Sequence, residues 1–315
     1  MIYYIEKMFT NLFKRFSIQA ILVSFFLSFS FNLLNLYLRA AGILYSEILY
    51  HSLILTLNVI LFIIIIYFSE SKRLKINFGA SHLLSFPICI LLLYQGDGSN
   101  LNGQKLIVGF FLLLAGNIFS KEFKKGYKAK DLFNLGMIFT IISFINIYLS
   151  FFFISIIFLI PQIIDKQKAL ISLFLGCFSS LSTLITLTYY YTGQVFYSRP
   201  EILNSNFTFE NKKVFSELFW TFIVIVLMVF SIVKFNDRGK SSNANYNVKI
   251  FMLFWLLISI VFRVFNLYQD SSLWLLSFIP SAYLLGIIFE RFEKQINREF
   301  LFYSLSIFGI VSKIF

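Results

Sequence analysis

Residues 106–160 read LIVGFFLLLAGNIFSKEFKKGYKAKDLFNLGMIFTIISFINIYLSFFFISIIFLI. A short, lysine-rich loop near the middle of this stretch separates one apolar run from two others. A helix needs about twenty apolar residues to cross a bilayer, or somewhat fewer where the bilayer thins locally. The alternation of apolar runs with short basic loops therefore predicts membrane-spanning helices.

The composition of the whole chain favours the same fold class. Of its 315 residues, 58% are hydrophobic, 20% are aromatic and only 13% are charged, and the mean hydropathy is +0.80. A soluble fold with so few charges could not cover the surface that faces water. The few glycines and prolines also argue against a linker-rich multidomain protein. We expect one transmembrane domain over residues 18–315, preceded by an amphipathic segment over residues 1–17.

The first sixteen residues carry apolar and polar side chains at helical spacing. This pattern predicts a helix in the cytoplasmic interface, with its basic face toward anionic headgroups. The apolar face is formed by Ile5, Met8, Phe9, Leu12, Phe13 and Phe16, and the polar face by Glu6, Lys7, Thr10, Asn11, Lys14 and Arg15.

The apolar runs together predict an all-α, polytopic transmembrane helical bundle of about ten or eleven spans. The segments 81–119 and 132–164 each hold two short runs, which are compatible with tilted spans or with re-entrant hairpins. Either alternative begins and ends each pair on the same side, so the orientation is unaffected. The expected spans are 18–38, 50–68, 81–95, 105–119, 132–147, 149–164, 170–192, 216–233, 250–268, 272–289 and 299–315.

The distribution of lysine and arginine predicts the orientation. Most of them fall in the N-terminal segment and in the loops at 69–80, 120–131, 165–169, 234–249 and 290–298. The positive-inside rule places these parts in the cytoplasm, together with the N-terminus, and makes 193–215 the largest external loop. The net charge of +12 is explained by this pattern. We expect a multi-pass membrane protein whose surroundings are the lipid bilayer, and no nucleic-acid partner.

A set of polar residues is expected near the external face. An arginine inside a span is costly enough to suggest a function, and guanidinium groups bind phosphate in a bidentate way. The alternative is structural, because an arginine near a helix end can reach the interface or pair with an aspartate for packing. The candidate residues are Arg263, Asp270, Asn266, Arg199, Glu201 and Arg39.

Other sites receive less support from the sequence. The two histidines, His51 and His82, are expected near opposite membrane faces, so we predict no metal site, and the absence of phosphate-loop and dinucleotide motifs predicts no cofactor. Cys89 and Cys177 lie in apolar runs and are expected to pack as small hydrophobic residues. No acidic residue lies at the middle of an expected span, which argues against ion-coupled transport.

Residues 106–160, together with INFGASHLLSFPICILLLYQ at 76–95, resemble an uncharacterised multi-pass inner-membrane family of Bacteroidota. The closing stretch at 273–305, LWLLSFIPSAYLLGIIFERFEKQINREFLFYSL, is similar to the same family. This resemblance implies an inner membrane and no particular chemistry. A weaker similarity of layout links the chain to membrane glycan polymerases and lipid-dependent glycosyltransferases. The first external loop, 39–49, departs from their pattern because Glu47 is its lone acidic residue.

Two functional hypotheses follow from these observations. The first is a non-catalytic scaffold or assembly component that binds other membrane proteins. The second is an outer-leaflet enzyme or carrier for lipid-linked glycans. In that case Arg263, Arg199 and Arg39 would bind the polyprenyl diphosphate, and Asp270 or Glu201 would act as a base. Ion-coupled transport is a third, less favoured alternative.

Overall fold

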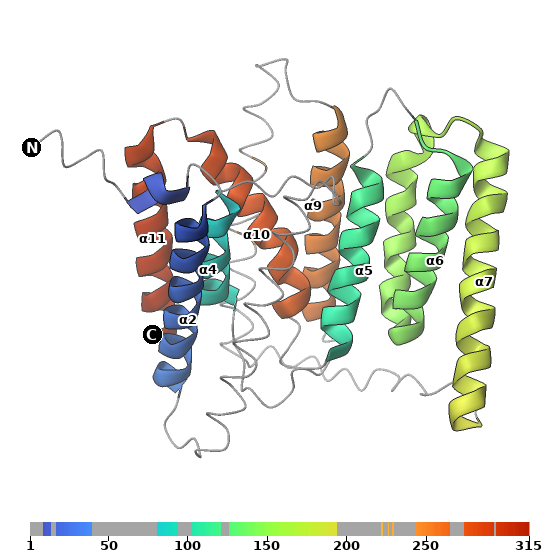
Figure 1. Ribbon diagram of the computed structural model, residues 1–315, viewed down its shortest axis with the longest axis horizontal. Helices are drawn as coiled ribbons and strands as arrows, with labels where there is room; N and C mark the ends of the chain where they lie inside the picture. Colours follow the sequence, from blue (N-terminus) through green and yellow to red (C-terminus); the bar gives the residue numbers. More distant parts are fainter. Residues whose placement is uncertain are drawn as a thin grey trace, which may run out of the picture. The chain divides into compact units, whose positions relative to one another are not determined.

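The computed structural model describes residues 9–13, 17–39, 81–93, 103–120, 126–193, 222, 226, 229, 243–264, 274–292 and 294–314. The regular elements in these ranges are all helices (Figure 1). Within the same ranges, strand-like pairing is limited to one isolated bridge between Tyr127 and Ile163. The all-α class expected from the sequence is therefore confirmed for the described part of the chain.

The helices group into two compact units, each of which is treated by itself. Unit 1 comprises residues 1–102, 209–239 and 270–315, and unit 2 comprises 103–208 and 240–269. Unit 1 contains η1 (Phe9–Phe13), α2 (Ile18–Arg39), α4 (His82–Leu93), α10 (Trp274–Arg291) and α11 (Gln295–Ile314). Unit 2 contains α5 (Gly103–Phe119), α6 (Ala129–Ile145), η3 (Ile147–Gln162), α7 (Lys166–Thr192) and α9 (Asn243–Val264).

Helix α4 forms the centre of unit 1. Every residue from His82 to Leu93 is buried, because α2, α10 and α11 all pack against this helix. A helix that is apolar on all sides has no preferred solvent face, which suits this central position. The rings of Phe86 on α4 and Phe278 on α10 meet edge to face, with centroids 5.5 Å apart.

Unit 2 has an aromatic core between α5, η3 and α9. Phe119 stacks on Phe251 with ring centroids 4.4 Å apart. Phe152 and Trp255 also neighbour Phe251, with centroids 6.4 and 6.3 Å from it. Phe139 of α6 extends the cluster through Phe152. Such offset and tilted aromatic pairs add favourable contact energy to the burial of the rings.

Helices α6 and α7 pack backbone to backbone through two glycines. A Cβ atom on Gly176 would overlap the carbonyl oxygen of Phe133, and one on Gly136 would crowd the carbonyl of Leu173. Cys177 fills the space beside Gly136, with its Sγ 3.7 Å from the Gly136 carbonyl oxygen. Small residues let helices approach this closely, which maximises contact between the two backbones.

Helix α7 differs from the other described helices in length and exposure. Within the described ranges it is the one helix that is long and apolar enough to cross a membrane by length and composition. The shorter apolar helices Ile18–Phe31, His82–Leu93, Ile107–Phe119, Ile147–Gln162, Asn247–Phe262 and Leu276–Glu290 coincide with expected spans. The expected span at 50–68 and most of 216–233 lie outside the described residues, so the span number stays a prediction.

Several helix boundaries differ from the expected ones. The break inside 132–164 falls at Asn146, whose extended backbone ends α6 and whose side-chain oxygen accepts a hydrogen bond from the Tyr148 amide. Helix α9 begins at Asn243 instead of residue 250, because Asn247 is buried among polar partners rather than exposed in a loop. In the N-terminal segment, residues 9–13 form a 3-10 helix. Thr10, which helical spacing placed on the polar face, is buried there.

Candidate functional site

Two of the six residues expected near the external face belong to described helices. Arg39 ends α2, and Arg263 lies one residue before the end of α9. Arg199, Glu201, Asn266 and Asp270 lie outside the described residues. The external cluster therefore stays a prediction.

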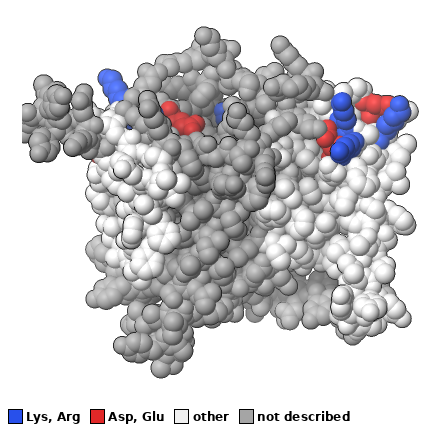
Figure 2. Space-filling model, viewed as in Figure 1, with Lys and Arg blue, Asp and Glu red and all other residues white. Residues whose placement is uncertain are grey.

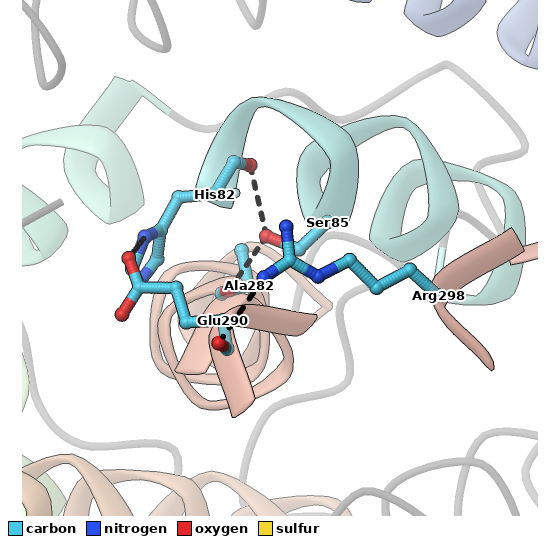
Figure 3. Close-up of polar contacts among 5 residues, drawn as sticks. All are labelled: His82, Ser85, Ala282, Glu290 and Arg298. Atoms are coloured by element: carbon cyan, nitrogen blue, oxygen red, sulfur yellow. Dashed lines mark hydrogen bonds and ion pairs between the residues drawn. The ribbon is translucent and has the colours of Figure 1, made fainter. Parts of the chain in front are cut away.

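A buried polar site that the sequence did not predict lies in unit 1 (Figure 3). His82, the first residue of α4, faces Glu290 near the end of α10, with 3.7 Å between Nδ1 and Oε1. The His82 side chain is fully buried, whereas the Glu290 side chain is 45% exposed. The pair thus links a buried imidazole to a carboxylate that reaches the surface of unit 1.

One face of α10 shapes the pocket for the His82 ring. Tyr283, Gly286 and Glu290 are spaced three and four residues apart, so they share a face of the helix. A Cβ atom on Gly286 would overlap the imidazole, which therefore lies directly on the α10 backbone. The Tyr283 ring lies beside it, with centroids 5.5 Å apart. The glycine is the reason a full imidazole fits between the two helices.

Ser85, one turn further along α4, joins the same two helices. Its Oγ lies 2.9 Å from the His82 carbonyl oxygen and 2.7 Å from the Ala282 carbonyl oxygen of α10 (Figure 3). A hydroxyl has a single proton to donate, so the two carbonyls share it. The hydroxyl is committed to backbone acceptors and not to the imidazole, so Ser85 is not arranged as a nucleophile that a histidine activates.

Arg298 closes the end of α10 near Glu290. Its Nε donates to the Phe292 carbonyl oxygen at 2.6 Å, and its Nη2 donates to the Glu290 carbonyl oxygen at 3.3 Å. A guanidinium at the C-terminal end of a helix satisfies carbonyls that lack an intrahelical partner and interacts favourably with the helix dipole. The neighbouring Glu299 accepts hydrogen bonds from the amide and hydroxyl of Thr10 at 3.0 and 3.3 Å. Arg298 thus fixes the turn into α11. Glu299, the next residue of α11, holds η1 against that helix.

The geometry limits the chemistry of the His82–Glu290 pair. The 3.7 Å between Nδ1 and Oε1 is longer than a hydrogen bond. The two groups attract each other as an ion pair only when the imidazole carries a proton. Within the described ranges, no group of three or more histidine, cysteine or acidic side chains is arranged to hold a metal ion.

A second buried polar cluster connects four segments of unit 2. The side-chain amides of Gln162 and Asn247 bond reciprocally, at 2.7 and 3.1 Å. Asn247 also donates to the Tyr127 hydroxyl at 3.1 Å, and that hydroxyl donates to the Phe119 carbonyl oxygen at 3.0 Å. Burial raises the pKa of Tyr127 to about 12, against the lowering effect of the Asn247 hydrogen bond. A fully bonded network of this kind holds its segments in one arrangement.

The two clusters show what the sequence alone left out. His82 was expected near a membrane face; it begins α4 and is buried beside a carboxylate. Gly286, four residues before Glu290, was the feature of the sequence that could have suggested this contact, since a small residue opposite a histidine permits close packing.

No protein-family model, curated protein or solved structure matches the chain.

Proposed function

We propose that this chain is a multi-pass protein of a bacterial inner membrane, where it acts as a non-catalytic scaffold or assembly component of a membrane complex. The observation that carries this proposal is the apolar surface of α7. The buried residues of helix α7 form one narrow stripe and are Ala169, Gly176 and Ser180. The exposed apolar side chains include Leu170, Ile171, Phe174, Leu175, Phe178, Leu181 and Leu187.

The two ends of α7 support a transmembrane position. Lys166 and Lys168 begin the helix, and Tyr189, Tyr190 and Tyr191, each at least 60% exposed, lie near its end. The path from Lys168 to Tyr190 is about 33 Å at 1.5 Å per residue, close to the thickness of the hydrocarbon core. Lysine at the cytoplasmic side and tyrosine at the interface are the residues that anchor such helices.

The conformation of η3 supports a span of its own. An α-helix of sixteen residues reaches about 24 Å, which is short for a bilayer. A 3-10 helix rises about 2.0 Å per residue, so Ile147–Gln162 extends about 32 Å. Its exposed side chains are apolar and include Phe151, Ile154, Ile157 and Phe158. This favours a span over a re-entrant hairpin for the second half of 132–164.

The scaffold function is supported by the surface that α7 leaves uncovered. The helix packs mainly against α6, and the hydroxyls of Ser182, Thr183 and Thr186 on its exposed part donate to carbonyls of α7 itself. Internally bonded hydroxyls are tolerated in lipid, and small hydroxylated residues also occur where membrane helices associate. Such a face suits a second membrane protein.

Extraction of the native complex tests the proposal. The full chain would be purified from membranes in a mild detergent, and co-purifying proteins and lipids would be identified by mass spectrometry. A stoichiometric membrane protein partner is expected. A stoichiometric polyprenyl diphosphate without a protein partner would instead favour the outer-leaflet enzyme or carrier, with Arg263, Arg199 and Arg39 as its ligands. Recovery of the chain in the soluble fraction would contradict the membrane assignment itself.

A further inference from the structure

We infer that the paired N-terminal ends of α6 and α7 form a binding surface for the anionic headgroups of cytoplasmic-leaflet phospholipids. The inference rests on the proposed membrane function and names a partner for one defined part of the chain. The surface consists of the exposed side chains of Lys128, Lys130, Lys166 and Lys168. We call these residues the lysine surface.

The fold brings the two halves of the lysine surface together. The isolated bridge pairs the segment before α6 with the segment before α7, in parallel. The Tyr127 amide donates to the Gln162 carbonyl oxygen at 3.0 Å, and the Ile164 amide donates to the Tyr127 carbonyl oxygen at 3.3 Å. Both helices therefore begin at the same level. The Tyr127–Gln162–Asn247 network holds this junction from the buried side.

Acidic side chains of unit 2 neutralise only part of the positive charge of the lysine surface. Asp165 caps α7 and lies 3.2 Å from the Lys168 ammonium. Asp131 is buried, and its Oδ2 accepts a hydrogen bond from the Lys128 amide at 3.0 Å. Within the described ranges, Lys128, Lys130 and Lys166 form no ion pair. Figure 2 shows these charges gathered at one end of the unit, above a surface without charged side chains.

The position of the lysines is unfavourable for the helices themselves. The N-terminal end of a helix carries partial positive charge, so lysines in the first turn reduce helix stability. Because α6 and α7 begin side by side, this loss of stability applies to both helices. An anion in front of the two ends would interact favourably with the ammonium groups and with the partial positive charge of both helix ends. The arrangement is thus better suited to an external anion than to stabilising α6 and α7.

The neighbouring apolar surface identifies the source of the anion. Ile164, Leu170, Ile171 and Phe174 are each more than half exposed, and they flank Lys166 and Lys168 at the start of α7. A free phosphate would leave these side chains uncovered, whereas a phospholipid would cover them with its acyl chains. The flexible lysine stems can follow the apolar surface and place their charges at headgroup level. The combination fits a phospholipid with net negative charge, such as phosphatidylglycerol.

Lipid retention by the purified full-length protein tests this inference. Delipidated protein would be mixed with equal amounts of phosphatidylglycerol and phosphatidylcholine in detergent and re-isolated. The bound lipids would then be quantified at low salt and at about 1 M salt, where charges are strongly screened. We expect retained lipid to be enriched in phosphatidylglycerol at low salt. In the variant that combines Lys128→Gln, Lys130→Gln, Lys166→Gln and Lys168→Gln, enrichment should fall about fivefold for each lysine that contacts the headgroup.

The matched control replaces the same four lysines by arginine. This control keeps the charge, so it should retain phosphatidylglycerol as the native protein does. Equal retention of the two lipids by the native protein, or unchanged enrichment in the glutamine variant, would overturn the inference. If the glutamine variant lost an acidic co-purifying protein while its bound lipid stayed unchanged, this would overturn the inference as well. Carbonate-resistant association with membranes is measured alongside, because its loss in the native protein would refute the proposed function rather than the lysine surface alone.

Discussion

The imidazole of His82 lies on the backbone of Gly286, while its Nδ1 is 3.7 Å from the Glu290 carboxylate one turn further along α10. This contact depends on the missing side chain at position 286. Any larger residue there would have to displace a ring that is fully buried. The α4–α10 interface is therefore built around the histidine, and its stability should depend on both residues together.

Gly286→Ala should destabilise unit 1 by about 1–3 kcal/mol, because the added Cβ overlaps the His82 ring and the buried ring has little room to move. Thermal unfolding of the purified chain in detergent measures this change. The double variant His82→Ala/Gly286→Ala completes the cycle: with the ring removed, the added methyl group should cost less than it does in the native protein. Additive effects of the two substitutions would contradict the contact described here.

Gly176→Ala should loosen the contact between α6 and α7 by a similar amount, about 1–3 kcal/mol. The added methyl group would overlap the carbonyl of Phe133, a backbone atom that cannot rotate away. Ser182→Ala is the control, because Ser182 lies on the exposed part of α7 and its hydroxyl bonds only within the helix. Unfolding in detergent and proteolysis of the α6–α7 region would report the change. Equal unfolding temperatures for the two variants would argue against the close backbone approach.

Asp165 should make the start of α7 sensitive to acid. The hydrogen bond from the Lys168 amide, followed by the interaction with the Lys168 side chain, lowers the pKa of Asp165 below its ordinary value. A lowered pKa in the folded state means that the carboxylate contributes stability above its unfolded pKa and loses it as the pH falls through the folded value. The contribution should therefore decline progressively as the pH falls below about 4.

Comparison with Asp165→Asn isolates this effect. Asparagine keeps an oxygen that can cap the helix, but it does not titrate. Protection of the first-turn amides of α7 from hydrogen exchange, taken relative to their intrinsic rates at each pH, should fall in acid for the native chain and stay nearly constant for the variant. A parallel acid response in both proteins would assign the sensitivity to other groups.

Reporter fusions after residues 125, 205 and 240 test the expected orientation. The positive-inside rule places 125 and 240 in the cytoplasm and 205 outside. A reporter active only in the cytoplasm should be active at the first and third positions, and a reporter active only outside should be active at the second. External activity at 125 would refute both the orientation and the cytoplasmic position of the lysine surface.

Part of this architecture could be read from local pattern. The apolar runs at 18–38, 105–119 and 299–315 became helices α2, α5 and α11 with small shifts at their ends, because predominantly apolar segments favour a helix wherever water is excluded. The start of α9 could not be read in this way. Asn243 to Asn247 look like a polar loop, yet they continue the helix, since Gln162 and Tyr127 supply partners for the Asn247 amide.

In the candidate sites, too, local sequence pattern indicated some features and tertiary packing decided the others. The lysines that begin α6 and α7 were visible as short basic loops, but their meeting at one level required the bridge between Tyr127 and Ile163. The six residues expected near the external face, from Arg39 to Asp270, remain a sequence prediction. Thr10 was expected on a polar face and is instead buried against Glu299, because a partner distant in the chain replaced water.

The pairing of His82 with Glu290 belongs entirely to tertiary structure. Composition and hydropathy determined the helical class of the described chain and the approximate position of its helices, because these depend on residues close together in sequence. Local pattern carries no information about which helix faces lie against each other. Only the packing of α4 on α10, made possible by the bare backbone at Gly286, decided that a buried imidazole would lie beside a carboxylate.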